Sequence, residues 1–255
     1  MLRSLDSLVR SNLWVYNQAR KSAVFLCRYV LLEEGFSFLR HIEPKVGAIA
    51  VDIGSNDGTS IEMIRQIHPT VLIHSFDPVT SPAKSHANLT FHDVALSDRP
   101  GILNLYIPTV RRWTLTQYSS IDHEKIASQL MEDFDLSHEE IEFTSKQAEC
   151  VQLDSLDLIP YFIKIDVEGQ EEAVVRGAIK TIAVHKPVLL IEIQSFEGYR
   201  SMQNLMREVG YFNLRWPQSR KDAFAQTPGH YSRRRNNYLW IPNSNSRNWT
   251  PRKIR

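Results

Sequence analysis

The stretch Val51-Asp-Ile-Gly-Ser-Asn-Asp-Gly-Thr59 decides how this chain folds. It follows an apolar run at residues 48–53 and precedes a helical pattern at 60–66, which together predict a strand, a tight turn and a helix. Gly54 permits the positive φ that such a turn requires, and Gly58 leaves room for a ligand beside the outward-facing N–H groups of the helix N-terminus. Open α/β sheets bind ligands at the carboxyl ends of their strands, so we expect a ligand here.

The glycine spacing narrows the class of ligand. Gly54 and Gly58 form a G-x-x-x-G pattern, which matches neither the dinucleotide fingerprint nor the phosphate-binding loop. A second apolar run, residues 71–76, ends at Asp77, 19 positions after Gly58. In such folds an acidic residue at about this distance binds ribose hydroxyls. A purely structural turn is the alternative, but Asp77 favours a nucleoside ligand without a pyrophosphate, such as S-adenosylmethionine.

Length and composition indicate one domain with an extension. The 255 residues can bury a full core, and a net charge of +1 favours no particular partner. Cys27 and Cys150 are too few for a disulfide framework or a zinc site, which favours a reducing, cytoplasmic setting. Residues 1–11 do not resemble a secretory signal, and the apolar run at 23–32 is too short to span a bilayer.

The two ends of the chain differ from its centre. Residues 1–45 show a helical period and predict an N-terminal extension that packs on the domain or covers the ligand site, with dimer or peripheral membrane contact as alternatives. Residues 200–255 contain twelve Lys or Arg, including the cluster Arg233-Arg-Arg235. This cluster is either a solvated loop or a site for an anionic acceptor, and no nucleic-acid-binding motif accompanies it. Residues 243–255 form a polar tail.

The centre alternates between predicted strands and helices, which indicates an α/β sheet. Beyond the first two strands, we expect strands at residues 89–96, 102–107, 149–153, 161–165, 187–193, 211–216 and 237–241, the last two antiparallel, and helices at 170–180 and 199–209. Residues 109–147 are long for a loop in such a domain and contain an acidic, partly helical segment at 122–142. We expect this insert to form an acceptor-binding lid, although a surface excursion is the alternative.

Several motifs in this order resemble FkbM-type S-adenosylmethionine-dependent methyltransferases. They are Asp52-Ile-Gly-Ser-Asn-Asp-Gly58, Phe76-Asp-Pro78, Val94-Ala-Leu-Ser-Asp98, Ile163-Lys-Ile-Asp-Val-Glu-Gly169 with Glu171, Gly177-Ala178, Lys186-Pro187 and Ile191-Glu192. The resemblance covers roughly residues 46–195, and we expect the closing strands to extend it to about 242. Asp77 stands where the family usually has Glu, and Asp93 where Asn is common; the first change retains the ribose-binding carboxylate.

The resemblance implies a Rossmann-like class I methyltransferase fold. This fold has a mostly parallel seven-stranded sheet, an antiparallel last strand and helices on both faces, here over residues 46–242. The implied cofactor is S-adenosylmethionine, and the implied reaction is O-methylation of a hydroxyl on a sugar, glycan or natural product, with no nucleic-acid partner. A catalytically inactive binding module on the same fold is the main alternative. A nucleotide-cofactor oxidoreductase is less favoured because the third glycine of the fingerprint is missing.

The same resemblance implies which residues contact the cofactor. The expected cofactor-binding residues are Asp52, Gly54, Asn56 and Gly58 at the methionine end and turn, Asp77 at the ribose, and Asp93 and Val94 beside the adenine. They lie near or beyond the carboxyl ends of predicted strands, where the ligands of such sheets bind.

Methyl transfer to a hydroxyl also requires alignment and removal of a proton. Asp166, Glu168 and Glu192 follow or end adjacent predicted strands and are the candidate catalytic residues, with His123 and His138 of the insert as further candidate bases. Lys164 lies inside a buried strand and should pair with a carboxylate on a neighbouring element. One alternative is a buried ion network of Lys164, Glu168 and Glu192. Another is a Mg²⁺ ion held by Asp166 and Glu192, which would acidify the acceptor hydroxyl.

Overall fold

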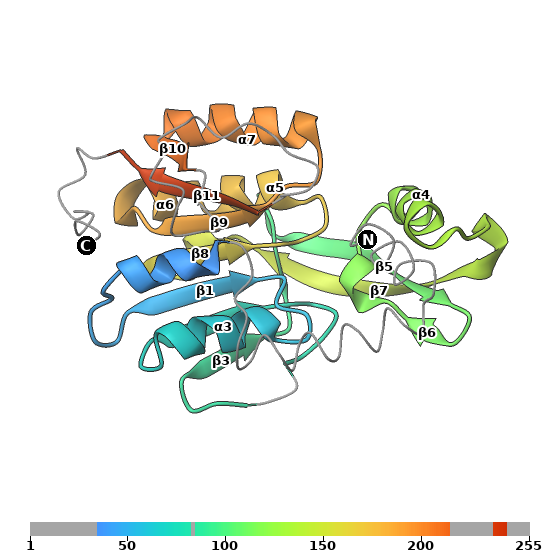
Figure 1. Ribbon diagram of the computed structural model, residues 1–255, viewed down its shortest axis with the longest axis horizontal. Helices are drawn as coiled ribbons and strands as arrows, with labels where there is room; N and C mark the ends of the chain where they lie inside the picture. Colours follow the sequence, from blue (N-terminus) through green and yellow to red (C-terminus); the bar gives the residue numbers. More distant parts are fainter. Residues whose placement is uncertain (1–34, 83–84, 215–236, 244–255) are drawn as a thin grey trace, which may run out of the picture. The chain divides into compact units, whose positions relative to one another are not determined.

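The computed structural model describes residues 35–82, 85–214 and 237–243. Nearly all of the predicted N-terminal extension, Cys27, the Arg233–Arg235 cluster and the polar tail therefore lie outside the described residues. The described chain divides into a larger unit, formed by residues up to 101 and from 149 onward, and a smaller unit formed by Ile102–Ala148. Figure 1 shows both units, with the smaller one mostly in green.

A seven-stranded sheet forms the centre of the larger unit, in the order β10-β11-β9-β8-β1-β2-β3 (Figure 1). Its strands are β1 (Ile49–Ile53), β2 (Leu72–Phe76), β3 (Leu89–His92), β8 (Pro160–Ile165), β9 (Val188–Glu192), β10 (Tyr211–Leu214) and β11 (Asn237–Pro242). All neighbours are parallel except β11, which runs antiparallel to β9 and to β10. The predicted sheet, including its antiparallel closing pair, is confirmed.

Helices cover both faces of this sheet. They are η1 (Phe36–His41, a 3-10 helix), α3 (Thr59–Ile67), α5 (Glu171–Gly177), α6 (Ile179–His185) and α7 (Phe196–Glu208). Phe36 of η1 packs edge-on against Phe162 of β8 with ring centroids 6.3 Å apart, on the face that also carries Asp52 and Lys164. The opposite face is one apolar core, whose members include Val51, Ile163, Leu189, Val174, Ile182 and Met202. Burial on both faces explains why the central strands read as continuous apolar runs.

The strands of the smaller unit form part of a second, four-stranded sheet, which has the order β4-β7-β5-β6. Its strands are β4 (Ala95–Leu96), β5 (Gly101–Val110), β6 (Trp113–Thr114) and β7 (Ile141–Val151). The strand expected at 89–96 was wrong as a single strand, because it is split between two sheets as β3 and β4. The strands expected at 102–107 and 149–153 are confirmed in part: residues 102–107 lie within the longer β5, and residues 149–151 end the longer β7. Alternating side chains indicate an extended chain, but they do not identify the strand with which it pairs.

Helix α4 (His123–Phe134) covers this second sheet and gives the smaller unit its own core. Asp122 begins the helix by accepting a hydrogen bond from the Lys125 N–H, which is the usual role of an N-terminal cap. Leu130 and Phe134 on its buried side pack with Val110 of β5. The insert at 109–147 thus has regular structure, and its role as an acceptor-binding lid stays a prediction, as do the base roles of His123 and His138.

We expect the protein to lose stability in acid, because the larger unit contains three partly buried histidines. Burial lowers the pKa of His68, His74 and His92, and the adjacent His92 ring lowers that of His74 further. The unfolded chain titrates near pH 6.5 and therefore binds more protons than the folded protein as the pH falls through this value. The stability that the neutral histidines contribute should be fully present above pH 6.5, and the free energy of unfolding should decrease as the pH falls below this value.

This pH dependence can be measured by urea unfolding at pH 7.5 and 5.5. His74 Nδ1 lies 3.1 Å from His92 Nε2, so His74→Gln should make the stability less dependent on pH. The same substitution at exposed His138 is the control and should leave the slope unchanged. A wild-type protein equally stable at both pH values would contradict the prediction.

Among the residues that the structure describes, no helix is long and apolar enough to cross a membrane.

Candidate functional site

The glycine turn after β1 is shaped by a close contact between two strand ends. Gly54 has φ 77° and its N–H donates to the Phe76 carbonyl oxygen at 2.9 Å. A Cβ atom at this position would lie 1.7 Å from the carbonyl oxygen of Asp166, which follows β8. Gly54 is therefore needed both for its positive φ and because the backbone of the neighbouring strand end leaves no room for a side chain.

The backbone N–H groups of this turn point to acceptors within the protein. The Asn56 N–H donates to Asp77 Oδ2 at 2.8 Å, the Gly58 N–H to the Ser55 carbonyl at 2.8 Å, and the Thr59 N–H to Asp57 Oδ1 at 3.1 Å. We expected outward-facing donors near Gly58, and this expectation was wrong for Gly58 and Thr59. A phosphate-binding loop directs such N–H groups toward its ligand. The turn after β1 directs these N–H groups to acceptors within the protein, so it suits a ligand without a pyrophosphate.

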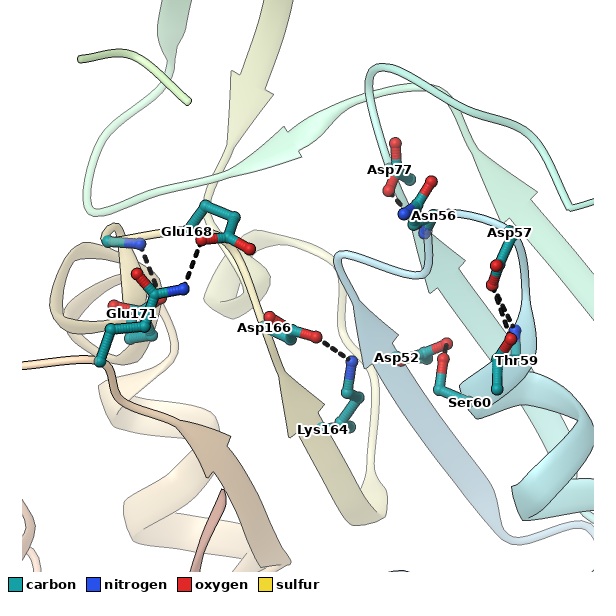
Figure 2. Close-up of polar contacts among 12 residues, drawn as sticks. Asp52, Asn56, Asp57, Thr59, Ser60, Asp77, Lys164, Asp166, Glu168 and Glu171 are labelled. Atoms are coloured by element: carbon teal, nitrogen blue, oxygen red, sulfur yellow. Dashed lines mark hydrogen bonds and ion pairs between the residues drawn. The ribbon is translucent and has the colours of Figure 1, made fainter. Parts of the chain in front are cut away.

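Asp77 joins this turn to the loop after β2. The residue is only 6% exposed. Its carboxylate accepts the Asn56 N–H on Oδ2 and the N–H groups of Val79 and Thr80 on Oδ1, each at 2.8 Å. A carboxylate offers about four acceptor positions, so these three bonds leave one on Oδ2. Figure 2 shows Asp77 beside Asn56. Asp77 can therefore stabilise the turn and accept one further hydroxyl.

A buried polar layer lies beneath the turn. Asp52 is fully buried and accepts the Ser60 hydroxyl on Oδ2 at 2.6 Å, while its Oδ1 has no hydrogen-bond partner. Burial raises the pKa of Asp52, and the nearby Lys164 ammonium and the Ser60 hydroxyl oppose part of this rise. Asp52 is the residue opposite Lys164 in the pairing of β1 with β8. The positive charge of Lys164 therefore helps to keep a carboxylate in the interior.

Lys164 itself forms an ion pair with Asp166, at 2.9 Å between Nζ and Oδ2 (Figure 2). Its side chain is 5% exposed and that of Asp166 is 28% exposed. We expected a carboxylate on a neighbouring element, and Asp52 of β1 does lie opposite Lys164, but the ion pair is formed with Asp166, two residues along the same chain segment. Alternate residues of an extended segment face the same side, and this explains the pairing.

Loss of the Lys164 ammonium should destabilise the fold. Lys164→Met preserves most of the side-chain volume but leaves Asp52 and Asp166 without their cation, and breaking a buried pair in this way lowers the free energy of unfolding by about 3 kcal/mol. Adding Asp52→Asn should restore part of the loss, because the second buried charge is then removed. Urea unfolding measures both effects.

The exposed Lys180 provides the matched control. Lys180→Met should change stability by less than about 0.5 kcal/mol. If Lys164→Met is as stable as Lys180→Met, Lys164 does not compensate the buried carboxylates.

The loop after β8 places a second set of polar groups at the same sheet edge. Glu168 accepts a hydrogen bond on Oε2 from Nε2 of Gln194, which follows β9 (Figure 2). The Gly169 N–H donates to Glu171 Oε1 at 2.8 Å. Gln194 was not among the predicted site residues. The sequence feature that could have identified it is its position two residues after Glu192, because alternate residues of an extended segment face the same side.

The remaining predicted site residues occupy separate positions. Glu192 is the last residue of β9, is half-buried and pairs in register with Asn237 of β11. Asp93 is exposed between β3 and β4, whereas Val94 packs against the main core. Their assigned roles stay predictions. Within the described ranges, no three His, Cys, Asp or Glu side chains are grouped to hold a metal ion, so the arrangement gives the Mg²⁺ alternative no support.

A cavity of about 480 Å³ lies elsewhere on the larger unit. Its lining includes Arg40, Glu43, Gln66 and His68, which lie in or next to η1 and the end of α3. These residues precede β1 or β2, whereas the ligands of such sheets bind beyond the carboxyl ends of the strands. We therefore place the candidate site at the glycine turn.

Comparisons with known proteins identify the family of this chain. The family model described as the methyltransferase FkbM domain matches residues 52–212, more than half of the chain. None of the curated proteins compared with the chain matches it.

Three of the solved structures that resemble the chain are described as methyltransferases. An FkbM methyltransferase from Methylobacillus flagellatus KT shares 16% identity with a TM-score of 0.46, over 84% of this chain and 47% of that one. The precorrin-6y C5,15-methyltransferase from Geobacter metallireducens GS-15 shares 10% identity with a TM-score of 0.38, over 84% and 89%. The mycinamycin-pathway methyltransferase MycE, in complex with Mg and SAH, shares 12% identity with a TM-score of 0.36, over 93% and 52%. This chain spans about half the length of the FkbM and MycE structures.

Proposed function

The chain belongs to the FkbM methyltransferase family, and from that premise we propose that it transfers a methyl group from S-adenosylmethionine to a hydroxyl of a sugar, glycan or natural product. The observation that carries the proposal is the buried Asp77 carboxylate, which is held against the glycine turn and retains one acceptor position. A ribose hydroxyl is a donor that fits this position. The inward-facing N–H groups of the turn also suit a nucleoside without phosphates.

The residues around Asp77 define the proposed cofactor site. Asp52, Gly54, Asn56 and Gly58 form the turn that would receive the methionine end, and Asp93 and Val94, in the segment after β3, would border the adenine. S-adenosylmethionine supplies a methyl group that its positive sulfur already activates. The protein must then align the acceptor oxygen with that methyl group and exclude other orientations.

The acceptor proton requires a base at the same sheet edge. As the acceptor oxygen forms its bond to the methyl carbon, the carbon–sulfur bond breaks, S-adenosylhomocysteine leaves, and a carboxylate takes the proton. Asp166, Glu168 and Glu192 are the candidates. We assign the base role to Glu168, because the Asp166 carboxylate is engaged by the Lys164 ammonium at 2.9 Å, whereas the hydrogen bond that Glu168 accepts comes from a neutral amide. Glu192 is the second candidate.

Calorimetric titration of the folded protein with S-adenosylhomocysteine tests the cofactor. We expect micromolar binding and no binding of NADH, because a glycine turn of this pattern lacks the dinucleotide fingerprint. If the folded wild type binds NADH but not S-adenosylhomocysteine, it is an oxidoreductase-like protein. If it binds neither, the fold serves as a non-catalytic module.

The acceptor class needs a second measurement. The protein is incubated with S-adenosylmethionine and a panel of sugars, glycans and hydroxylated natural products, and S-adenosylhomocysteine release is followed together with the mass of the acceptor. A gain of one methyl group on a hydroxyl supports the proposal. Methylation confined to nitrogen or carbon would contradict it.

A further inference from the structure

The loop that follows β8 has an unfavourable backbone conformation at Glu168. Glu168 has φ 52° and the next residue, Gly169, has φ 101°. Glycine tolerates such angles, whereas a non-glycine residue in the left-handed region costs about 1 kcal/mol or more. A glycine at position 168 would therefore suit the backbone better. The backbone conformation therefore does not explain why this position carries a glutamate.

Two polar contacts fix the geometry of this loop. The Gly169 N–H donates to Oε1 of Glu171, whose side chain is nearly buried at the start of α5. The Glu168 carboxylate receives a hydrogen bond from the Gln194 amide (Figure 2). An ionised carboxylate only accepts hydrogen bonds, so the amide nitrogen rather than its oxygen must face Glu168. Gln194 thereby binds Oε2 and defines the direction in which Oε1 points.

From this geometry we propose that Gln194 is a positioning residue for Glu168. Because β8 and β9 are parallel neighbours, the segments that follow them meet at one edge of the sheet. A hydrogen bond donated to a carboxylate favours its ionised form, which is the form that takes a proton. Gln194 thus keeps Glu168 ionised and oriented. The role of Glu168 as the base rests on the proposed function, whereas the control of its ionisation by Gln194 does not.

The test follows the ionisation of Glu168 directly, and needs no acceptor. The full chain is labelled with ¹³C at the glutamate carboxyl carbons, Glu168→Gln identifies the signal, and the titration is recorded with and without S-adenosylhomocysteine. In Gln194→Ala the midpoint should move to higher pH, because the donor is lost. In Gln194→Glu it should move further, since two carboxylates in contact share one proton.

A nearby amide serves as the matched control. Gln170 donates to the Gly169 carbonyl in the same loop, so Gln170→Ala disturbs the loop without removing the donor to Glu168. We expect it to leave the Glu168 midpoint unchanged. S-adenosylhomocysteine affinity should stay within about threefold of wild type in the Gln194 and Gln170 variants, which shows that the cofactor site remains intact.

The outcomes separate this inference from the proposed function. A Glu168 midpoint that is the same in wild type and Gln194→Ala would overturn the positioning role, even if S-adenosylhomocysteine binds. An equal shift in Gln170→Ala would also overturn it, because general loosening of the loop would then explain the effect. If the wild type does not bind S-adenosylhomocysteine, the proposed cofactor is wrong. The titration of Glu168 without ligand would still test whether Gln194 positions this residue.

Discussion

Gly54→Ala is expected to lower the free energy of unfolding by about 4 kcal/mol and to leave a large share of the protein unfolded at 37 °C. Two effects add at this position. An alanine at φ 77° adopts the left-handed conformation at a cost of about 1 kcal/mol. Its Cβ would lie 1.7 Å from the Asp166 carbonyl oxygen, so β1 and β8 must separate at their carboxyl ends, which costs about 3 kcal/mol.

Two other glycines separate these effects. Gly47 has φ 75° but no atom within 4 Å of the position of a Cβ, so Gly47→Ala measures backbone strain alone, about 1 kcal/mol. Gly177 is helical, and a Cβ there would lie 1.9 Å from the Ser97 carbonyl oxygen, so Gly177→Ala measures the steric effect without a positive φ. Urea unfolding of the three variants should rank Gly54→Ala as the least stable. A Gly54→Ala protein that is as stable as Gly47→Ala would show that the strand ends are not in firm contact.

The local elements around the glycine turn could be predicted from the sequence because local patterns determine them. An apolar run, two glycines four positions apart and a helical period correspond to β1, the turn and α3. The second strand and its terminal Asp77 followed from the same kind of pattern. The antiparallel closing pair was also predicted, since Tyr211 and Asn237 each begin an apolar run after a turn or polar segment.

The parts that could not be predicted depend on contacts between distant segments. Residues 102–107 alternate as a strand should, but nothing local shows that β5 pairs in a second sheet with β7, some 40 residues later. The partner of Lys164 was missed for a different reason: Asp166 was regarded as a catalytic group and not as a counter-ion. The donor to Glu168 was missed because Gln194 belongs to no motif.

The described site is a set of carboxylates with different partners at one sheet edge. Asp52 is compensated by Lys164 and Ser60, and Asp77 by three backbone N–H groups, while Glu168 accepts a hydrogen bond from the Gln194 amide. Burial of a carboxylate is unfavourable unless hydrogen bonds or a cation compensate for it. These partners therefore distinguish acids that stabilise the fold from acids that keep acceptor capacity for a ligand. Asp77 does both, which makes it the most informative residue to change.

Asp77→Ala should weaken S-adenosylhomocysteine binding by at least about 100-fold, equivalent to about 2.7 kcal/mol. The variant removes the acceptor proposed for a ribose hydroxyl and leaves the N–H groups of Asn56, Val79 and Thr80 without their partner. Asp77→Glu keeps the charge and carries the residue usual in the family, so it should bind within about tenfold of wild type. Calorimetric titration of each folded variant gives both affinities.

Asp57 in the same turn provides the control that separates ligand contact from loosening of the turn. Its carboxylate accepts the N–H and hydroxyl of Thr59 at the start of α3, so Asp57→Ala removes two hydrogen bonds of the turn, at a cost of about 1 kcal/mol of stability. If Asp57→Ala weakens binding as much as Asp77→Ala, the loss reflects a disordered turn and the ribose assignment is wrong. If Asp77→Ala binds as the wild type does, the ribose assignment is likewise wrong. A large loss confined to Asp77→Ala would identify this carboxylate as the ribose acceptor, because both variants loosen the turn and only one removes the proposed contact.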